Sequence, residues 1–173
     1  SYHAPAIYLM NPRGHDYELQ STHLWAANAQ VTTGTGMLIK SMQGKAKIAG
    51  WLRHTGPTII SEGELLVNGD ILGPVKLRAK GTLSGSVTLY DTLTFEGALN
   101  HEGCRLMPSN WNDPYEGVIT SKKSMTLPGN VYLEVSTIFM GNSAGSWPVC
   151  GKLMVEGDLT FKNTNYITVH LGD

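Results

Sequence analysis

The sequence predicts an all-β fold, specifically a parallel β-solenoid in which short strands stack turn upon turn. The first observation is a glycine-bounded pattern that occurs twice. Residues 63–71 and 151–159 both read Gly-x-Leu-x-Val-x-Gly-Asp-(Ile/Leu), and the second begins 88 positions after the first. A looser copy at residues 81–89 begins 18 positions after the first. Short strand-like copies of this kind are typical of stacked repeat architectures.

The second observation is that nearly every apolar run is short and ends at Gly, Pro, Asn or Asp. Alternation is clearest where Val131, Leu133 and Val135 share one face of an extended segment. The preceding Pro128-Gly129 pair suits a type II turn. The predicted strands, in order, are Ala6–Met10, Met37–Lys40, Lys45–Ala49, Thr58–Ile60, Glu64–Val67, Val75–Leu77, Ser86–Leu89, Thr92–Phe95, Gly117–Ile119, Ser124–Leu127, Val131–Phe139, Lys152–Val155, Leu159–Phe161 and Tyr166–Leu171.

The glycine pattern leads to two structural expectations. Its apolar positions should be buried at equivalent places in the two copies, namely Leu65, Val67, Leu153 and Val155. Its glycines should mark corners, because glycine adopts positive φ without the strain other residues meet. We expect positive φ at two or more of Gly63, Gly69, Gly151 and Gly157.

A β-sandwich is the alternative fold, although it would use longer strands and clearer hairpin signals. Helix signals are confined to residues 16–31, where Asp16 can cap a helix, but the apolar positions fit no single helical face. We therefore divide the chain into an N-terminal capping or linking segment, residues 1–33, and a solenoid module, residues 34–173. The first segment is expected to lie beside Met37–Lys40, because uncovered strand edges promote aggregation.

Composition restricts the classes of partner. The 13 Lys and Arg residues and 14 Asp and Glu residues give a net charge of −1, which argues against nucleic acid or an anionic membrane surface as a partner. No apolar stretch approaches the roughly 18 residues of a membrane-spanning helix. The start lacks a signal-like region, and the end follows a strand-like run, so we expect a fragment of a larger protein.

Residues 54–69, His-Thr-Gly-Pro-Thr-Ile-Ile-Ser-Glu-Gly-Glu-Leu-Leu-Val-Asn-Gly, resemble the autotransporter-associated β-strand repeat. Close similarity covers about residues 34–90, and a weaker similarity covers residues 151–171. The chain departs from the pattern at His54, where an aromatic residue is usual, and at Glu62 and Glu64. The resemblance implies a right-handed β-helix in a large secreted or surface protein, either a bacterial passenger region or a module beside a polysaccharide-degrading enzyme. It brings no catalytic residues with it.

Signals for catalysis are weak. Gly141-Asn-Ser-Ala-Gly145 matches the nucleophile pattern around Ser143, but that motif needs a strand before it and a helix after it. Glu62, Glu64 and Asp70 fall near one corner region, where a carboxylate pair would be needed for glycosidic chemistry. Elsewhere acids and bases are scattered singly. We therefore expect no catalytic residues, no cofactor and no metal site.

The strongest binding candidate is the loop around residues 110–116. Aromatic rings stack on the C–H faces of sugars while amides and carboxylates take the hydroxyl groups. A glycan contact is accordingly assigned to Trp111, Asn112, Asp113 and Tyr115, with Trp147 as a helper. The same oxygen-rich loop also fits a calcium site or a simple Asx-rich turn.

Cys104 and Cys150 are the only cysteines. They either pair in an oxidising compartment or serve as small buried apolar residues.

These observations favour a non-catalytic structural module, a scaffold or spacer, of a secreted or surface-exposed bacterial protein. The alternative is a carbohydrate-binding accessory module of a polysaccharide-degrading enzyme. The expected partners are the flanking domains of the parent chain and a polysaccharide or cell-surface glycan, and the expected location is extracellular or on the bacterial surface.

Overall fold

The computed structural model describes residues 5–20, 30–97, 103–109, 117–142 and 145–171. This part of the chain is all strand and connection, and it contains no helix of the length and apolar character needed to cross a membrane. The strands are β1 (Ala6–Met10), β2 (Tyr17–Gln20), β3 (Gln30–Thr32), β4 (Met37–Ser41), β5 (Lys45–Ala49), β6 (Trp51–Leu52), β7 (Thr58–Ile60), β8 (Gly63–Ile71), β9 (Val75–Arg78), β10 (Gly81–Gly85), β11 (Val87–Leu89), β12 (Leu93–Glu96), β13 (Cys104–Pro108), β14 (Val118–Ser121), β15 (Met125–Leu127), β16 (Val131–Asn142), β17 (Gly145–Cys150), β18 (Lys152–Val155), β19 (Leu159–Phe161) and β20 (Tyr166–Leu171).

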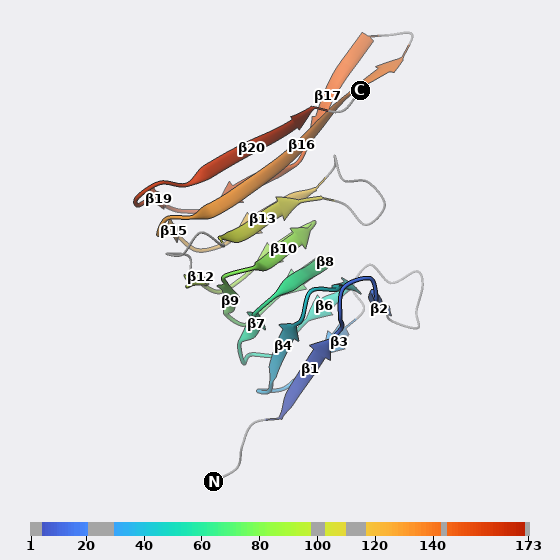
Figure 1. The fold of residues 1–173 in the computed structure, drawn as a ribbon, viewed down its shortest axis with the longest axis vertical. Helices are drawn as coiled ribbons and strands as arrows, with labels where there is room; N and C mark the ends of the chain where they lie inside the picture. The colour runs from blue at the N-terminus through green and yellow to red at the C-terminus, as the bar shows by residue number, and fades with distance from the viewer. Residues whose placement is uncertain (1–4, 21–29, 98–102, 110–116, 143–144, 172–173) are drawn as a thin grey trace.

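Parallel pairing arranges most strands in three stacks (Figure 1). Sheet A contains β1, β4, β7, β9 and β12. Sheet B contains β2, β5, the first part of β8, β10, β13, β16 and β20. Sheet C contains β3, β6, the last part of β8, β11, β14 and β18, so β8 joins sheets B and C. β15 pairs with β19 as a separate parallel pair, and β17 pairs with β16 as an antiparallel hairpin.

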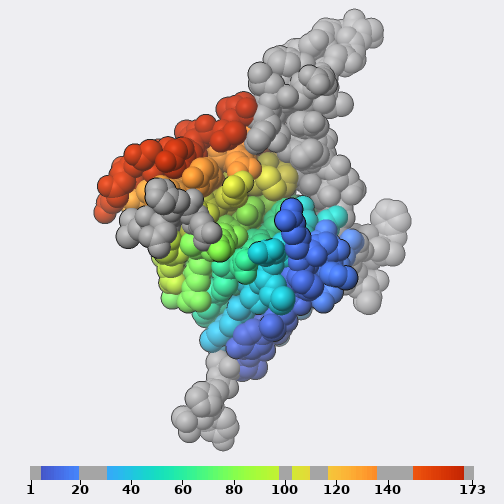
Figure 2. Space-filling model, viewed as in Figure 1, coloured from blue at the N-terminus to red at the C-terminus, as the bar shows by residue number. Residues whose placement is uncertain are grey.

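From β1 to β14 the chain passes through sheets A, B and C in the same order, and each passage lies on the one before it. Figure 2 shows the result as successive bands of colour along the long axis of the molecule. Where β8 meets β10 and β11, Gly63 pairs with Gly81 and Ile71 with Leu89, so the register equals the 18-residue offset predicted from the sequence. This offset is confirmed.

The core consists of rows of apolar side chains that run across the stacked strands. Ala46, Leu65, Leu83 and Leu106 are neighbours in sheet B and are all fully buried. Successive residues of a strand point to opposite faces, so the residues immediately before and after each of these four face outward. Burial is lost at both ends of the stack, where Ile7 is 48% exposed and Ile167 is 62% exposed.

The two closest sequence copies are not structurally equivalent. Leu65 and Val67 are fully buried in sheet B, as expected. Leu153 instead pairs with Ile119 in sheet C, and both Leu153 and Val155 are only partly buried against the core. The expectation of equivalence is wrong, because a local pattern specifies inward positions but not the sheet that receives them.

Glycine marks the corners. Gly63, Gly69 and Gly157 have φ values of 74°, 151° and 153°, which confirms the expectation for three of the four glycines named. At Gly69 a Cβ atom would lie 2.1 Å from the carbonyl oxygen of Gly50, the residue between β5 and β6. The corners therefore require glycine both for backbone conformation and for close approach of stacked backbones.

Three further expectations are resolved by the strand pairing. The parallel register excludes the alternative β-sandwich, which is antiparallel. The weak helix signal over residues 16–31 does not yield a helix at Tyr17–Gln20, which pairs with β5 as a strand. The N-terminal segment does lie beside Met37–Lys40, because β1 pairs with β4 along its whole length. The domain boundary at residue 33 stays a prediction.

We expect Gly69→Ala to destabilise the fold more than Gly14→Ala. Both positions have positive φ, so both substitutions should incur a backbone strain of about 1–3 kcal/mol. Only the Cβ at position 69 would also meet a neighbouring backbone, because nothing lies within 4 Å of the corresponding atom at Gly14. Urea unfolding of the two variants measures the difference. Equal losses of stability would show that close approach is not the constraint at this corner.

Candidate functional site

The glycan contact predicted at Trp111, Asn112, Asp113 and Tyr115 lies outside the described residues and stays a prediction. Trp147 lies on β17, of which the structure describes the backbone only.

Ser143, the residue of the nucleophile interpretation, lies outside the described residues, and only the strands on either side of it are described. Its motif joins β16 to β17, which form an antiparallel hairpin with Asn142 opposite Gly145. A strained nucleophile elbow needs a helix after the serine, and here a strand follows.

Two of the three carboxylates near the first glycine motif, Glu64 and Asp70, lie in different sheets. Glu64 lies in sheet B, where its carboxylate is 2.7 Å from Lys45 Nζ and accepts a 2.6 Å hydrogen bond from Ser84 Oγ. Asp70 lies on the part of β8 that belongs to sheet C. Among the described residues, no group of three or more His, Cys, Asp or Glu side chains has a geometry that could hold a metal ion.

Both cysteines are free thiols. Cys104 is fully buried, and its thiol donates to the carbonyl oxygen of Leu77 at 3.3 Å. Burial raises the pKa of this thiol to about 12, so it stays protonated and unreactive. Cys104 thus acts as a small core residue, the second of the two interpretations left open by the sequence.

The outer face of sheet C carries a surface cleft. Leu52, Ile71 and Leu89 form the inward row of this sheet and are fully buried. The residues on either side of each must point outward. Those outward residues are Trp51 and Arg53 around Leu52, Asp70 and Leu72 around Ile71, and Tyr90 after Leu89.

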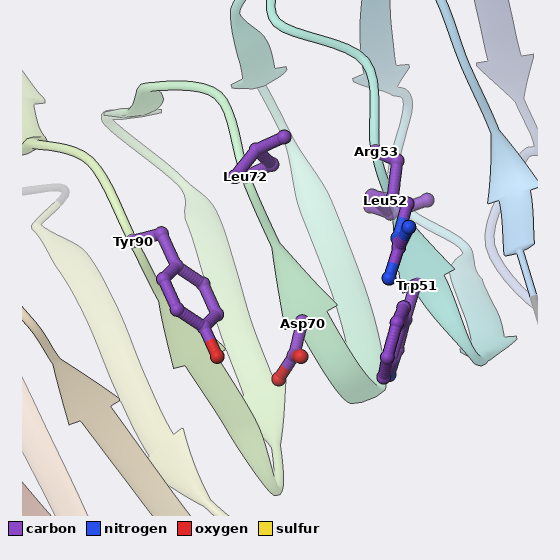
Figure 3. Close-up of a pocket in the computed structure, with 6 residues that line it drawn as sticks. All are labelled: Trp51, Leu52, Arg53, Asp70, Leu72 and Tyr90. Atoms are coloured by element: carbon purple, nitrogen blue, oxygen red, sulfur yellow. The ribbon is translucent and has the colours of Figure 1, made fainter. Parts of the chain in front are cut away.

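These outward side chains line a cleft of about 370 Å³, together with Leu52 (Figure 3). Trp51 and Tyr90 lie on either side of Asp70 and project to the same side of the sheet. The Arg53 guanidinium carbon lies 4.1 Å from the centroid of the Trp51 ring, a cation–π contact that restrains both side chains. We call this site the sheet C cleft.

The sheet C cleft is lined mainly by apolar surface, with one acidic side chain, Asp70, and one basic side chain, Arg53. Asp70 makes no hydrogen bond or ion pair with another described residue, so its oxygens are available to a ligand. The nearby Lys122 ammonium forms an ion pair with Glu156. The hydrogen bond that Lys122 donates to the Glu156 carboxylate raises the pKa of Lys122, with smaller contributions from Tyr90 and Asp70.

A buried lysine supports the corner between sheets A and B. Lys40 is fully buried, and its Nζ donates to the carbonyl oxygens of Ser41, Met42 and Glu62 at 3.0, 2.7 and 3.2 Å. These three bonds use all the donors of an ammonium group. Burial lowers the pKa of Lys40, opposed by nearby carboxylates, chiefly Glu62. The geometry is that of a structural cap for the carbonyl groups of a corner.

His54 performs a similar task at the corner between sheets C and A. It is 3% exposed, its Nδ1 lies 2.7 Å from Thr32 Oγ1, and its Nε2 lies 3.0 Å from Thr58 Oγ1. The three residues belong to three successive passages of the chain, so the imidazole links neighbouring levels of the stack. Burial lowers the pKa of His54, and the neutral imidazole is the form that can bond one threonine as donor and the other as acceptor.

No family model matches this chain, and no curated protein matches it. The resemblance to the autotransporter-associated β-strand repeat therefore rests on the residues quoted above, and it stays a prediction.

The sequence analysis missed the sheet C cleft because its residues come from three different passages of the chain. The 18-residue offset nevertheless contained a usable signal. Leu72 and Tyr90 are 18 positions apart, as are the buried Ile71 and Leu89 before them. Extending the offset one residue past the first glycine motif would have aligned Leu72 with Tyr90.

We expect the stability of the protein to fall as pH is lowered through and below 6.5, the ordinary pKa of histidine. Because the folded-state pKa of His54 is lowered, the unfolded state takes up a proton more readily, and this favours unfolding in acid. Urea unfolding at about pH 7.5 and pH 5.5 should show a smaller acid loss for His54→Gln than for the wild type. His15→Gln, at an exposed position, is the control and should keep the wild-type dependence. An unchanged dependence in His54→Gln would contradict this account.

Proposed function

We propose that the chain is a right-handed parallel β-solenoid segment that serves as a non-catalytic scaffold or spacer in a secreted or surface-exposed bacterial protein. The observation that carries the proposal is the stacking of successive chain passages in sheets A, B and C with a continuous buried core. Parallel crossover connections are right-handed in nearly all proteins, which supports the hand.

A scaffold role agrees with the way in which stability is distributed. Each passage of the chain contacts mainly the passages before and after it, so its stability is close to a sum of nearest-neighbour terms. Such a structure can act as a long, rigid spacer without containing a reaction centre. Two observations support a non-catalytic role. Lys45 and Ser84 both bind the Glu64 carboxylate, and the Cys104 thiol stays protonated.

A carbohydrate-binding accessory module is the second candidate function. The observation that favours it is the sheet C cleft, in which aromatic, acidic and guanidinium groups face solvent together. The two functions are compatible, because a rigid stack can display a binding face.

The solenoid proposal predicts that one whole turn can be removed. Deleting residues 63–80 joins Glu62 to Gly81, which would place Leu83 and Leu89 in the positions of Leu65 and Ile71. We expect this variant to retain a β-type circular dichroism spectrum and a cooperative thermal transition at a lower temperature.

A deletion of residues 63–71 is the matched control, because it removes half a turn and breaks the register of every later strand. It should lose the cooperative transition. If the 18-residue deletion unfolds as completely as the nine-residue deletion, the solenoid proposal is wrong.

The proposed secreted or surface location predicts the cell fraction in which the protein is detected. An antibody against the purified chain should detect it in the culture medium or at the surface of intact cells of the producing organism. Detection only in the cytosolic fraction would refute this location and leave the scaffold role to be judged by the deletion experiment.

A further inference from the structure

We propose that the sheet C cleft binds a neutral saccharide unit, with Trp51 and Tyr90 as its aromatic walls and with Asp70 and Arg53 as its partners for hydroxyl groups. This inference deepens the second candidate function and does not depend on the scaffold role. It assigns a glycan site to residues other than those of the 110–116 loop.

The first support is the placement of the aromatic rings. Trp51 and Tyr90 flank Asp70 on one face of sheet C (Figure 3), and Tyr90 is 43% exposed. The C–H faces of a pyranose ring are apolar, and aromatic side chains offer the flat apolar surface that such faces cover. The Arg53 guanidinium lies over one face of the Trp51 ring, so Tyr90 supplies the stacking surface and Trp51 borders the site. Leu72, also 43% exposed, enlarges the apolar lining of the cleft.

The second support is the polar chemistry between those walls. The Asp70 carboxylate has no hydrogen-bond or ion-pair partner within the described residues, and a carboxylate can only accept hydrogen bonds. The Arg53 guanidinium can only donate them. Hydroxyl groups both donate and accept, so a polyol can satisfy the two side chains at once.

Charge selects among ligands. The lining contains one acidic and one basic side chain, Asp70 and Arg53. A cation seated between the aromatic walls would meet the Arg53 guanidinium, and an anion would meet the Asp70 carboxylate. Attraction to one of the two side chains is offset by repulsion from the other, so the pair gives a charged ligand no net advantage, whereas a neutral saccharide can bond to both.

The spacing of the site indicates how a longer glycan would lie. Trp51, Asp70 and Tyr90 come from three successive strands of sheet C, and neighbouring strands lie about 4.8 Å apart. An extended glycan can therefore run across the strands, with one sugar unit near each strand. A site carried on hydrogen-bonded strands is formed before the ligand arrives, which reduces the entropy lost on binding.

The volume of the sheet C cleft is consistent with one or two sugar units. Small-molecule sites usually enclose about 300–1,000 Å³. At about 370 Å³ the cleft lies at the small end of that range. Further units would extend along the outer face of the stack.

The test is an array of neutral and charged oligosaccharides, followed by calorimetric titration of the best-bound neutral glycan. The variants are Tyr90→Ala and Asp70→Asn. Their matched controls are Tyr8→Ala, an exposed tyrosine on sheet A, and Asp158→Asn, an exposed aspartate outside the cleft. We expect neutral glycans to bind, and both cleft variants to bind roughly tenfold more weakly, while both controls match the wild type. Asp70→Asn keeps the side-chain shape, so the test does not depend on Tyr90→Ala folding well.

The proposal is overturned by any of three results. The first is the absence of binding to neutral glycans. The second is binding that the cleft variants leave intact but Trp111→Ala abolishes, which would move the site to the 110–116 loop. The third is preferential binding of charged glycans. None of these results would affect the scaffold proposal, which the turn deletion tests separately.

Discussion

Parallel pairing of stacked backbones is the constraint on which the rest of this structure depends. Strands about 4.8 Å apart bring each corner against the corner beneath it. At Gly69 the distance is so short that even a Cβ atom would collide with the Gly50 carbonyl oxygen. The same pairing aligns inward residues such as Leu65 and Leu83 into buried rows. Corner glycines and apolar rows are thus two consequences of one geometry.

Stacking also leaves backbone polar groups in the interior without partners, and two buried side chains bond to interior polar groups. Corners interrupt the hydrogen-bond ladders and leave carbonyl groups directed into the interior, where an unpaired polar group is costly. Lys40 donates to three such carbonyl oxygens, and the small size of Gly63 leaves room for its ammonium group. His54 connects the hydroxyl groups of Thr32 and Thr58 from the levels on either side. Both side chains tie neighbouring passages of the chain together, so their role is cohesion within the stack.

The outer faces of the stack are free of that packing requirement and can carry function. Outward residues on successive strands become neighbours in space although they are far apart in the sequence. Trp51, Asp70 and Tyr90 meet in this way at the sheet C cleft. A module with a structural interior can therefore present a recognition surface on its outside. On one strand, the inward residues are constrained by packing and the outward residues by binding.

The sequence by itself determined the all-β character, the short strands, the glycine corners and the 18-residue offset, because these depend on local alternation and backbone conformation. Only the tertiary structure decided which sheet each segment joins. Leu153 and Leu65 occupy matching places in the glycine motif yet lie in different sheets, and Tyr17–Gln20 is a strand because it pairs with β5. The sheet C cleft was also a tertiary outcome. Alternation along one strand predicts that Trp51, Asp70 and Tyr90 face outward, but only the register between strands brings the three side chains together.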